Sequence, residues 1–183
     1  MTTSPLWDRP SVVGKNTLTE LSICGKINIR GSVDNAHFLD SATQVFGLDL
    51  PLEPNTLASS GNSTCYWLGP DEWLLHCLIE ESDSLIESGR SKLATIHHAL
   101  VDVSDYYTVL RLEGPDSEIL LGKACPLDLH LSQFPVESCA QTRFGNASIL
   151  LHRRGKAPFF DIQVRWSHAE YVWDYLASAM KAL

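Results

Sequence analysis

Two stretches that recur in the two halves of the chain decide the fold: INIRG (residues 27–31) recurs as LRLEG (110–114), and GLDLP (47–51) recurs as PLDLH (126–130). Between the two stretches of each half, apolar side chains recur at helical spacing. Each half then continues into a hairpin and another helical segment. An internal repeat of this kind predicts two related structural units. We therefore expect an α+β protein with two split βαβ-type units, whose helices pack on mostly antiparallel sheets.

In the first half, residues 21–30 alternate apolar and polar side chains toward their end, which predicts a strand stopped by Gly31. Asp34 can cap a helix that ends at Gly47. Residues 51–62 carry two prolines, a glycine and several small polar side chains, so we expect a loop there.

A hairpin is predicted next from CYWLGPDEWLLHCLI (residues 65–79), with its turn at residues 69–72. Trp67 and Trp73 then face each other near this turn. Residues 82–94 show helical spacing.

In the second half we expect strands at residues 99–103 and 107–112, and a short helix opened by Gly114 and Pro115. A second hairpin is predicted around Gly145 and Asn146, because this dipeptide accepts a positive φ. Residues 159–165 predict one more strand. Ser167 and Glu170 predict a capping box before a final amphipathic helix. The expected domains are an N-terminal extension (1–20) and two units (21–98 and 99–183) packed as one compact body.

Charge and hydropathy exclude several functions. The net charge of -8 argues against nucleic-acid binding, which needs clustered lysine and arginine. The tightest basic group, Arg153, Arg154 and Lys156, is interpreted as a solvated strand end. Because no run of about 18 apolar residues and no signal peptide is present, we expect a cytoplasmic protein without a membrane partner.

The five cysteines form no CxxC pair and no compact ligand spacing. Most lie beside apolar residues, where cysteine behaves as a small hydrophobic side chain. We expect free buried thiols and no metal site.

No phosphate-binding loop, dinucleotide fingerprint, nucleophile elbow or HExxH motif is present. His97 and His98 are adjacent, so on a strand they would point to opposite faces and could not jointly bind one metal ion. Asp102 and Asp105 could act as acid and base in a cleft, but they also suit a turn, since Asp and Ser hydrogen-bond the nearby backbone.

The best polar constellation is Asp128 with His130, which alternate along an extended stretch and would share one face. Arg143 in the following hairpin is a possible salt-bridge partner. A structural ion pair at a bend or interface explains this group better than catalysis does, because no nucleophile accompanies it.

Five tryptophans are many for a small acidic protein, and exposed aromatic side chains often anchor interfaces. Trp173 belongs to the apolar stripe of the last helix and is expected in the core. Trp67 and Trp73 suit either the core or an interface.

The sequence also resembles a known family, the gamma subunits of heterotetrameric sarcosine oxidases. The resemblance runs from about residue 21 to about residue 176. Its motifs are IRG, FLDSATQVFGLDLPLEPNT, YWLGPDEWLL, VDVSD, LRLEGPDSEILLGKACPLDLH, CAQTRFG and SHAEYVWDYL. The hairpin motif and CPLDLH followed by AQTRFG are specific, whereas the apolar helices are not. The resemblance implies a fold related to the folate-binding domains of the glycine-cleavage aminomethyltransferase (T-protein).

The same resemblance implies the function. In that family the assembled enzyme oxidises sarcosine with oxygen to glycine and hydrogen peroxide, and releases formaldehyde or forms 5,10-methylenetetrahydrofolate. The beta subunit carries FAD and FMN, the alpha subunit NAD and the tetrahydrofolate site, and the delta subunit zinc. The resemblance assigns no cofactor and no catalytic residue to the gamma chain.

Two hypotheses follow. In the first, the chain is a non-catalytic subunit that supports alpha, beta and delta partners through a large permanent interface. In the second, it is an autonomous folate-binding one-carbon (aminomethyl) transferase, which would need a carboxylate poised in a central cleft. Asp102 and Asp128 are the candidates for that carboxylate. The chain is short for such an enzyme.

Overall fold

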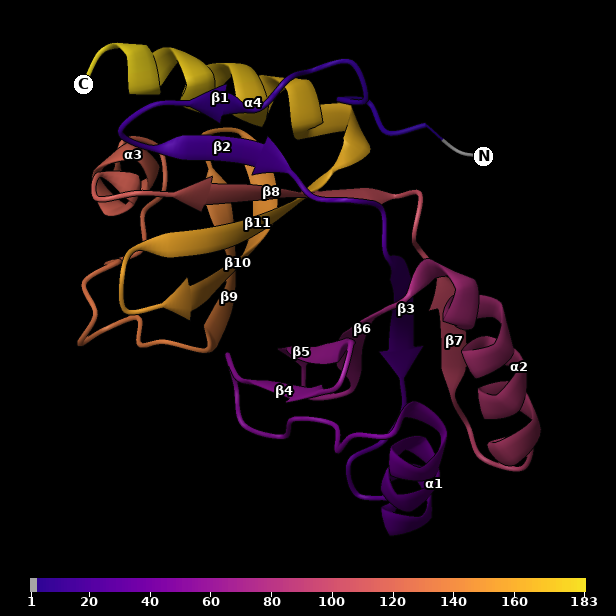
Figure 1. The fold of residues 1–183 in the computed structure, drawn as a ribbon. Helices are drawn as coiled ribbons and strands as arrows, with labels where there is room; N and C mark the ends of the chain where they lie inside the picture. Colours follow the sequence, from indigo (N-terminus) through magenta and orange to yellow (C-terminus); the bar gives the residue numbers. More distant parts are fainter. Residues whose placement is uncertain (1–2) are drawn as a thin grey trace. The chain divides into compact units, whose positions relative to one another are not determined.

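In the computed structural model, which describes residues 3–183, the chain divides into two compact units (Figure 1). Cys24–Ser104 form one unit, called the insert unit here. Residues up to Ile23 and Asp105–Leu183 together form the other, called the terminal unit. Each unit combines an antiparallel sheet with helices, which confirms the predicted α+β class.

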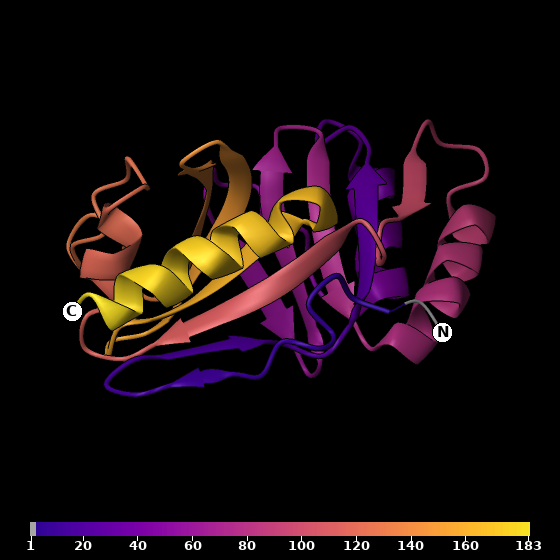
Figure 2. The ribbon, with the colours of Figure 1, turned by 90° about the horizontal axis from the view of Figure 1, so that it is seen from above.

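The sheet of the insert unit has five strands in the order β4-β5-β6-β3-β7, and every neighbouring pair is antiparallel. Their bounds are β3 Gly25–Arg30, β4 Leu57–Ser60, β5 Ser63–Gly69, β6 Glu72–Cys77 and β7 Ala99–Asp102. Strand β6 lies between β3 and β5, so the β3-α1-β5 connection is a split βαβ unit, as predicted. Strands β5, β6, β3 and β7 lie side by side in Figure 2.

Two helices, α1 (Ala36–Phe46) and α2 (Ser82–Lys92), complete the insert unit, with a short 3-10 turn at Ile79–Glu81. The N-cap of α1 is Asn35, whose side-chain oxygen accepts a hydrogen bond from the Phe38 N–H at 3.2 Å. The predicted cap, Asp34, is therefore wrong by one residue. Gly47 ends α1 in the left-handed conformation (φ 70°), as predicted.

The core of the insert unit lies between one face of its sheet and these two helices. Apolar side chains of alternate strand positions meet apolar side chains of α1 and α2 there, since successive strand residues point to opposite faces. The buried residues are Ile27, Ile29, Phe38, Ala42, Phe46, Leu48, Leu50, Cys65, Trp73, Leu75, Cys77, Ile86, Leu93 and Leu100.

The terminal unit has a six-stranded antiparallel sheet in the order β1-β2-β8-β11-β10-β9. The bounds are β1 Val12–Val13, β2 Thr17–Glu20, β8 Tyr107–Glu113, β9 Ser138–Phe144, β10 Ala147–Gly155 and β11 Phe159–Arg165. Helices α3 (Ser117–Gly122) and α4 (Trp166–Lys181) pack on it. Figure 2 shows α4, in yellow, lying across the strands.

The expected domain boundaries need correction. The N-terminal segment is no separate extension, because β2 pairs with β8 in the register Leu18↔Leu112. Strand β7 belongs to the insert unit, since Leu100 pairs with Ile29 of β3. Both pairings join segments far apart in the sequence, which local patterns cannot indicate.

Three local predictions also differ from the structure. The strand predicted over residues 21–30 begins only at Gly25, as β3, and residues 21–24 are irregular. The expected loop over residues 51–62 contains β4. The capping box does not form, because α4 begins directly after β11 and its N-cap, Arg165, makes no side-chain capping bond.

Other elements match their predictions closely. Both hairpins are present, and β11 has the predicted bounds, Phe159–Arg165. In the sequence these elements are marked by local turn residues and by alternation of apolar and polar side chains with a period of two. Within residues 3–183, no helix has the length and apolar character needed to cross a membrane.

Candidate functional site

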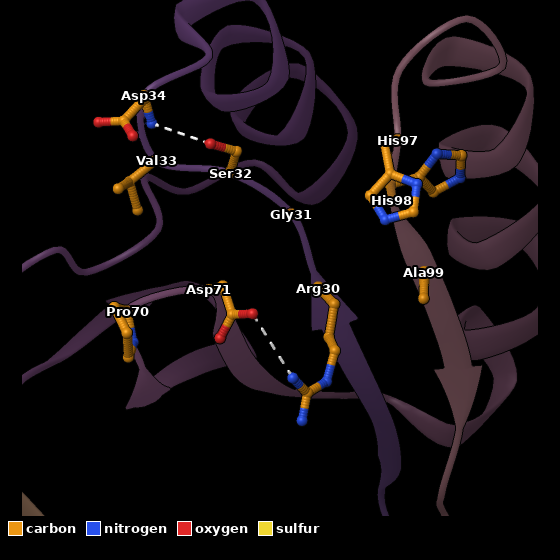
Figure 3. A pocket seen from close by; sticks show the side chains of 10 residues that line it. All are labelled: Arg30, Gly31, Ser32, Val33, Asp34, Pro70, Asp71, His97, His98 and Ala99. Atoms are coloured by element: carbon orange, nitrogen blue, oxygen red, sulfur yellow. Dashed lines mark hydrogen bonds and ion pairs between the residues drawn. The ribbon is translucent and has the colours of Figure 1, made fainter.

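The insert unit contains an open pocket of about 640 Å³, shown in Figure 3. Three chain segments line it: Arg30–Asp34 from the last residue of β3 onward, Pro70 and Asp71 in the β5-β6 turn, and His97–Ala99 up to the first residue of β7. All three segments lie at one end of the sheet. The split βαβ topology thus brings together residues far apart in the sequence.

Two of the lining residues, Arg30 and Asp71, belong to an ion-pair network. Arg30 Nη2 donates to Glu72 at 2.6 Å, and its Nη1 lies 3.7 Å from Asp71. Asn28 Nδ2 donates to the same Glu72 carboxylate at 2.8 Å. The Arg30 side chain is half exposed, so water weakens these pairs. Opposite them, Ser32 Oγ accepts from the Asp34 N–H at 3.3 Å (Figure 3).

Gly31 fixes the rim of the pocket. Its N–H donates to the backbone oxygen of Asp71 at 3.2 Å, which ties the loop after β3 to the hairpin turn. A Cβ atom at Gly31 would overlap the ring of Phe38. Only glycine allows this approach between the loop and α1.

His97 and His98 line the opposite wall (Figure 3). They precede β7, so the strand geometry expected for them does not apply. His98 Nδ1 lies 2.8 Å from the Ile96 carbonyl oxygen and therefore carries the proton, which leaves Nε2 as an acceptor when the ring is neutral. With these groups the pocket can hydrogen-bond a polar group.

The predicted constellation of Asp128, His130 and Arg143 is not assembled. Asp128 Oδ1 accepts from the backbone N–H of His130 at 2.9 Å, and His130 Nδ1 lies 2.8 Å from Ser132 Oγ. All three predicted side chains are exposed. Within residues 3–183 no ion pair joins Arg143 to Asp128, so that prediction is wrong. The aspartate instead closes its own turn.

Asp102 also closes a turn. Its Oδ1 accepts from the N–H of Ser104 at 2.8 Å and from the Ser104 hydroxyl at 2.5 Å. Ser104 Oγ in turn accepts from the Lys26 N–H at 2.9 Å. Of the two interpretations of VDVSD, the turn is the one observed.

Trp67 and Trp73 pair directly across β5 and β6, as predicted. Trp73 is fully buried, its Nε1 donates to the Pro51 carbonyl oxygen at 2.7 Å, and its ring centroid lies 6.0 Å from that of Phe38. Trp73 is therefore a core residue. Trp67 is half-buried.

The strongest polar cluster is one that the sequence analysis missed. The Arg153 side chain is fully buried, and its Nη2 donates to the Glu118 carboxylate and, at 2.5 Å, to the Leu129 carbonyl oxygen. Its guanidinium lies 4.8 Å above the centroid of the Phe160 ring. The prediction that Arg153 lies at a solvated strand end is therefore wrong. The alternation of Ile149 and other inward-facing residues along β10 could have revealed it.

Two further ion pairs belong to the terminal unit. Arg111 binds Asp161 through Nε and Nη2, at 2.7 and 2.9 Å. Asp116 accepts from Lys15 Nζ at 2.9 Å and from Asn16 Nδ2 at 3.0 Å. These two hydrogen bonds hold the pKa of Asp116 below its usual value.

The cysteines are free, as predicted, and four of the five are buried; Cys24 is half-buried. Burial raises the pKa of the Cys77 thiol to about 11, because desolvation disfavours the thiolate. Among residues 3–183, no group of three or more His, Cys, Asp or Glu side chains is placed to hold a metal ion.

Comparison with known proteins identifies the family. The family described as sarcosine oxidase, gamma subunit, matches residues 30–182. The chain belongs to the sarcosine oxidase gamma subunit family. Two members with the curated name sarcosine oxidase subunit gamma come from Corynebacterium. The one from strain U-96 is 34% identical over 90% of this chain and 78% of its own length. The one from strain P-1 is 31% identical over 93% and 82%.

Two solved structures are similar to this chain over most of its length. The chain is similar to a chain of heterotetrameric sarcosine oxidase from Corynebacterium sp. U-96, solved with pyrrole 2-carboxylate. The TM-score is 0.88 and the identity 28%, over 98% of this chain and 94% of the other. Glycine cleavage system aminomethyltransferase T from Bartonella henselae shares the fold, with a TM-score of 0.67, 12% identity and coverage of 95% of this chain and 56% of the other. The predicted relation to the aminomethyltransferase fold is confirmed.

Proposed function

We propose that this chain is the non-catalytic gamma subunit of a heterotetrameric sarcosine oxidase and acts in assembly of the complex. The observation that carries the proposal is the near-complete superposition on one chain of the Corynebacterium heterotetramer, over 98% of this chain and 94% of that one. Likeness over a whole subunit supports the same place in a complex better than a shared fold alone would.

The chemistry of the polar residues supports a structural role. Arg153 and Asp116 hold strands, loops and helices of the terminal unit together through hydrogen bonds. Asp102 and Asp128 close local turns. Polar side chains that are hydrogen-bonded within the chain in this way stabilise the fold.

The proposed partners are alpha, beta and delta subunits. In this proposal FAD, FMN, NAD, tetrahydrofolate and zinc are held by those subunits, and the complex oxidises sarcosine to glycine, hydrogen peroxide and a one-carbon unit. Trp67, Asp128, His130 and Arg143 have side chains that reach the surface, so we propose them as contact positions. Trp73 would support Trp67 from within the core.

The alternative, an autonomous aminomethyltransferase, required Asp102 or Asp128 to face a cleft. Neither residue lines the pocket of Figure 3, and both carboxylates accept backbone hydrogen bonds. The subunit proposal therefore accounts better for these two residues.

The test is co-expression of a tagged chain with the candidate alpha, beta and delta genes, followed by size exclusion. We expect the tag to elute in a complex with flavin absorbance and sarcosine-dependent peroxide production. Elution of the tagged chain by itself, with calorimetric binding of tetrahydrofolate, would instead support the transferase. Fractionation of the native host tests the cytoplasmic location, which stays a prediction.

A further inference from the structure

Trp7 is unusual among the tryptophans of this chain. Of the five, all of which lie within residues 3–183, Trp7 is the one with an exposed side chain, at 72% relative exposure. Trp73 and Trp173 are buried, and the other two are half-buried. Indole is a large apolar group that gains free energy when it leaves water, so an exposed one is a candidate contact.

The backbone that carries Trp7 is fixed on its N-terminal side. Leu6, its neighbour, is 1% exposed and belongs to the core of the terminal unit. The Leu6 N–H donates to Ser4 Oγ at 3.1 Å, and the Trp7 N–H donates to the Ser4 carbonyl oxygen at 3.2 Å. The Ser4 hydroxyl donates to Glu20, whose carboxylate also accepts from Thr108 Oγ1 at 2.5 Å. This turn is therefore anchored to the sheet.

Arg9 fixes the other side. Its N–H donates to the Leu6 carbonyl oxygen at 2.8 Å, which closes a second turn around Trp7. Its guanidinium donates to Asp174 of α4 at 2.6 Å. The indole is thus presented from a backbone held at both ends, and a rigid anchor loses less entropy on binding than a mobile one.

The charges beside this turn are mainly negative. The pKa of Arg9 is raised, first by its hydrogen bond with Asp174 and further by the charges of Asp174, Glu170 and Asp8. One of these carboxylates, Asp174, is paired with the guanidinium, and the charges of the other two act on it as well. Asp8 and Glu170 are both exposed, so their charges are available to a partner.

We propose that Trp7 inserts into an apolar pocket with a basic rim on a partner subunit of the oxidase. The proposal rests on the proposed function. Tryptophan is enriched among the few interface residues that dominate binding energy. The carboxylates of Asp8 and Glu170 would meet the basic rim and set the orientation of docking.

The test compares Trp7→Ala with the unaltered chain in the co-expressed complex. We expect the dissociation constant for the partner subunits, measured by dilution and size exclusion, to rise about thirtyfold. Trp7→Phe should recover most of the affinity because it keeps an aromatic anchor. Glu170→Gln should flatten the dependence of the dissociation constant on salt concentration.

The matched control is Leu52→Ala, which removes another exposed apolar side chain, 54% exposed, from the insert unit. If Trp7→Ala binds like the unaltered chain, or if Leu52→Ala loses as much affinity, the docking proposal is overturned while the subunit assignment stands. If the unaltered chain itself recovers no partner, the proposed function fails. A Trp7-dependent dimer of the isolated chain would assign the surface to a second copy and overturn the proposal.

Discussion

The two units differ in how their buried charged side chains are partnered. In the insert unit the ion pairs of Arg30 lie at the surface, the core cluster is aliphatic, aromatic and cysteine, and the buried Lys26 donates to a backbone oxygen, that of Cys24, at 3.2 Å. In the terminal unit Arg153 is fully buried, and Asp161 and Asp116 are nearly so. An apolar core is specified by shape, whereas a buried ion pair is specified by hydrogen-bond geometry and by charge. The two units should therefore respond differently to truncation, charge removal and pH.

The largest expected effect is in the insert unit. Trp73→Ala removes a fully buried indole and the hydrogen bond to Pro51, so the free energy of unfolding should fall by about 4 kcal/mol. Urea denaturation measures this change. Trp67→Ala, at the facing position of the hairpin, is the control and should cost about half as much because Trp67 is half-buried. Equal losses at the two positions would contradict the packing described for Trp73.

A smaller effect is expected from the buried cation of the terminal unit. Arg153→Met keeps much of the volume but leaves Glu118 and the Leu129 carbonyl without their donor, which should lower the unfolding free energy by about 2 kcal/mol. Glu118 is 34% exposed and can be hydrated, which limits the loss. Adding Glu118→Gln to Arg153→Met should restore part of it in the same urea experiment. If the double variant were less stable to urea than Arg153→Met, the unpaired charge of Glu118 would not be the cause of the destabilisation.

The third expected effect is a pH dependence of stability that comes from the terminal unit. The pKa of Asp116 is lowered by its hydrogen bonds from Lys15 and Asn16. The Asp116 carboxylate therefore contributes fully to the free energy of unfolding above the unfolded-state pKa, near 4. The contribution is lost as pH falls through the lower pKa of the folded state. Asp116→Asn should therefore be less stable than the unaltered chain at neutral pH, and the two should converge in strongly acid solution. If the difference in urea midpoint between Asp116→Asn and the unaltered chain stayed constant from pH 7 to pH 2, the role given to the Asp116 carboxylate would be contradicted.

The smallest effect concerns thiol reactivity in the insert unit. The pKa of Cys77 is raised to about 11 and its side chain is buried, so little thiolate is present or accessible at neutral pH. Cys24 is half-buried and should react first with a thiol reagent. Mass spectrometry after brief alkylation identifies the modified residue. Cys24→Ser should abolish the fast phase, whereas Cys77→Ser should leave it unchanged.

Local signals in the sequence predicted much of this fold. The hairpin of residues 65–79 and the strand Phe159–Arg165 are marked by turn residues and alternation, which act between close neighbours in the chain. The N-terminal strand β2 carried no such signal. It forms because β8 offers it a partner from a distant part of the sequence.

The polar residues were harder to predict for a related reason. A charged side chain is interpreted as solvated unless its environment is known, and burial of Arg153 depends on Glu118, Leu129 and Phe160, which come from other elements. Asp128 was expected to bind Arg143, yet the backbone N–H of His130 is a closer donor. The pocket of Figure 3 joins three segments that only the folded chain brings together.

The path of the chain through the two units sets an order on folding during synthesis. All strand pairings of the insert unit lie within residues 24–104, so it can fold as soon as that segment has left the ribosome. Strand β2 is made earlier but must wait for β8, and β8 in turn for β11. The nascent terminal unit therefore holds an N-terminal β1-β2 hairpin whose partner strand β8 is not yet in place while the insert unit is already complete. This early segment is among the last to reach its final place.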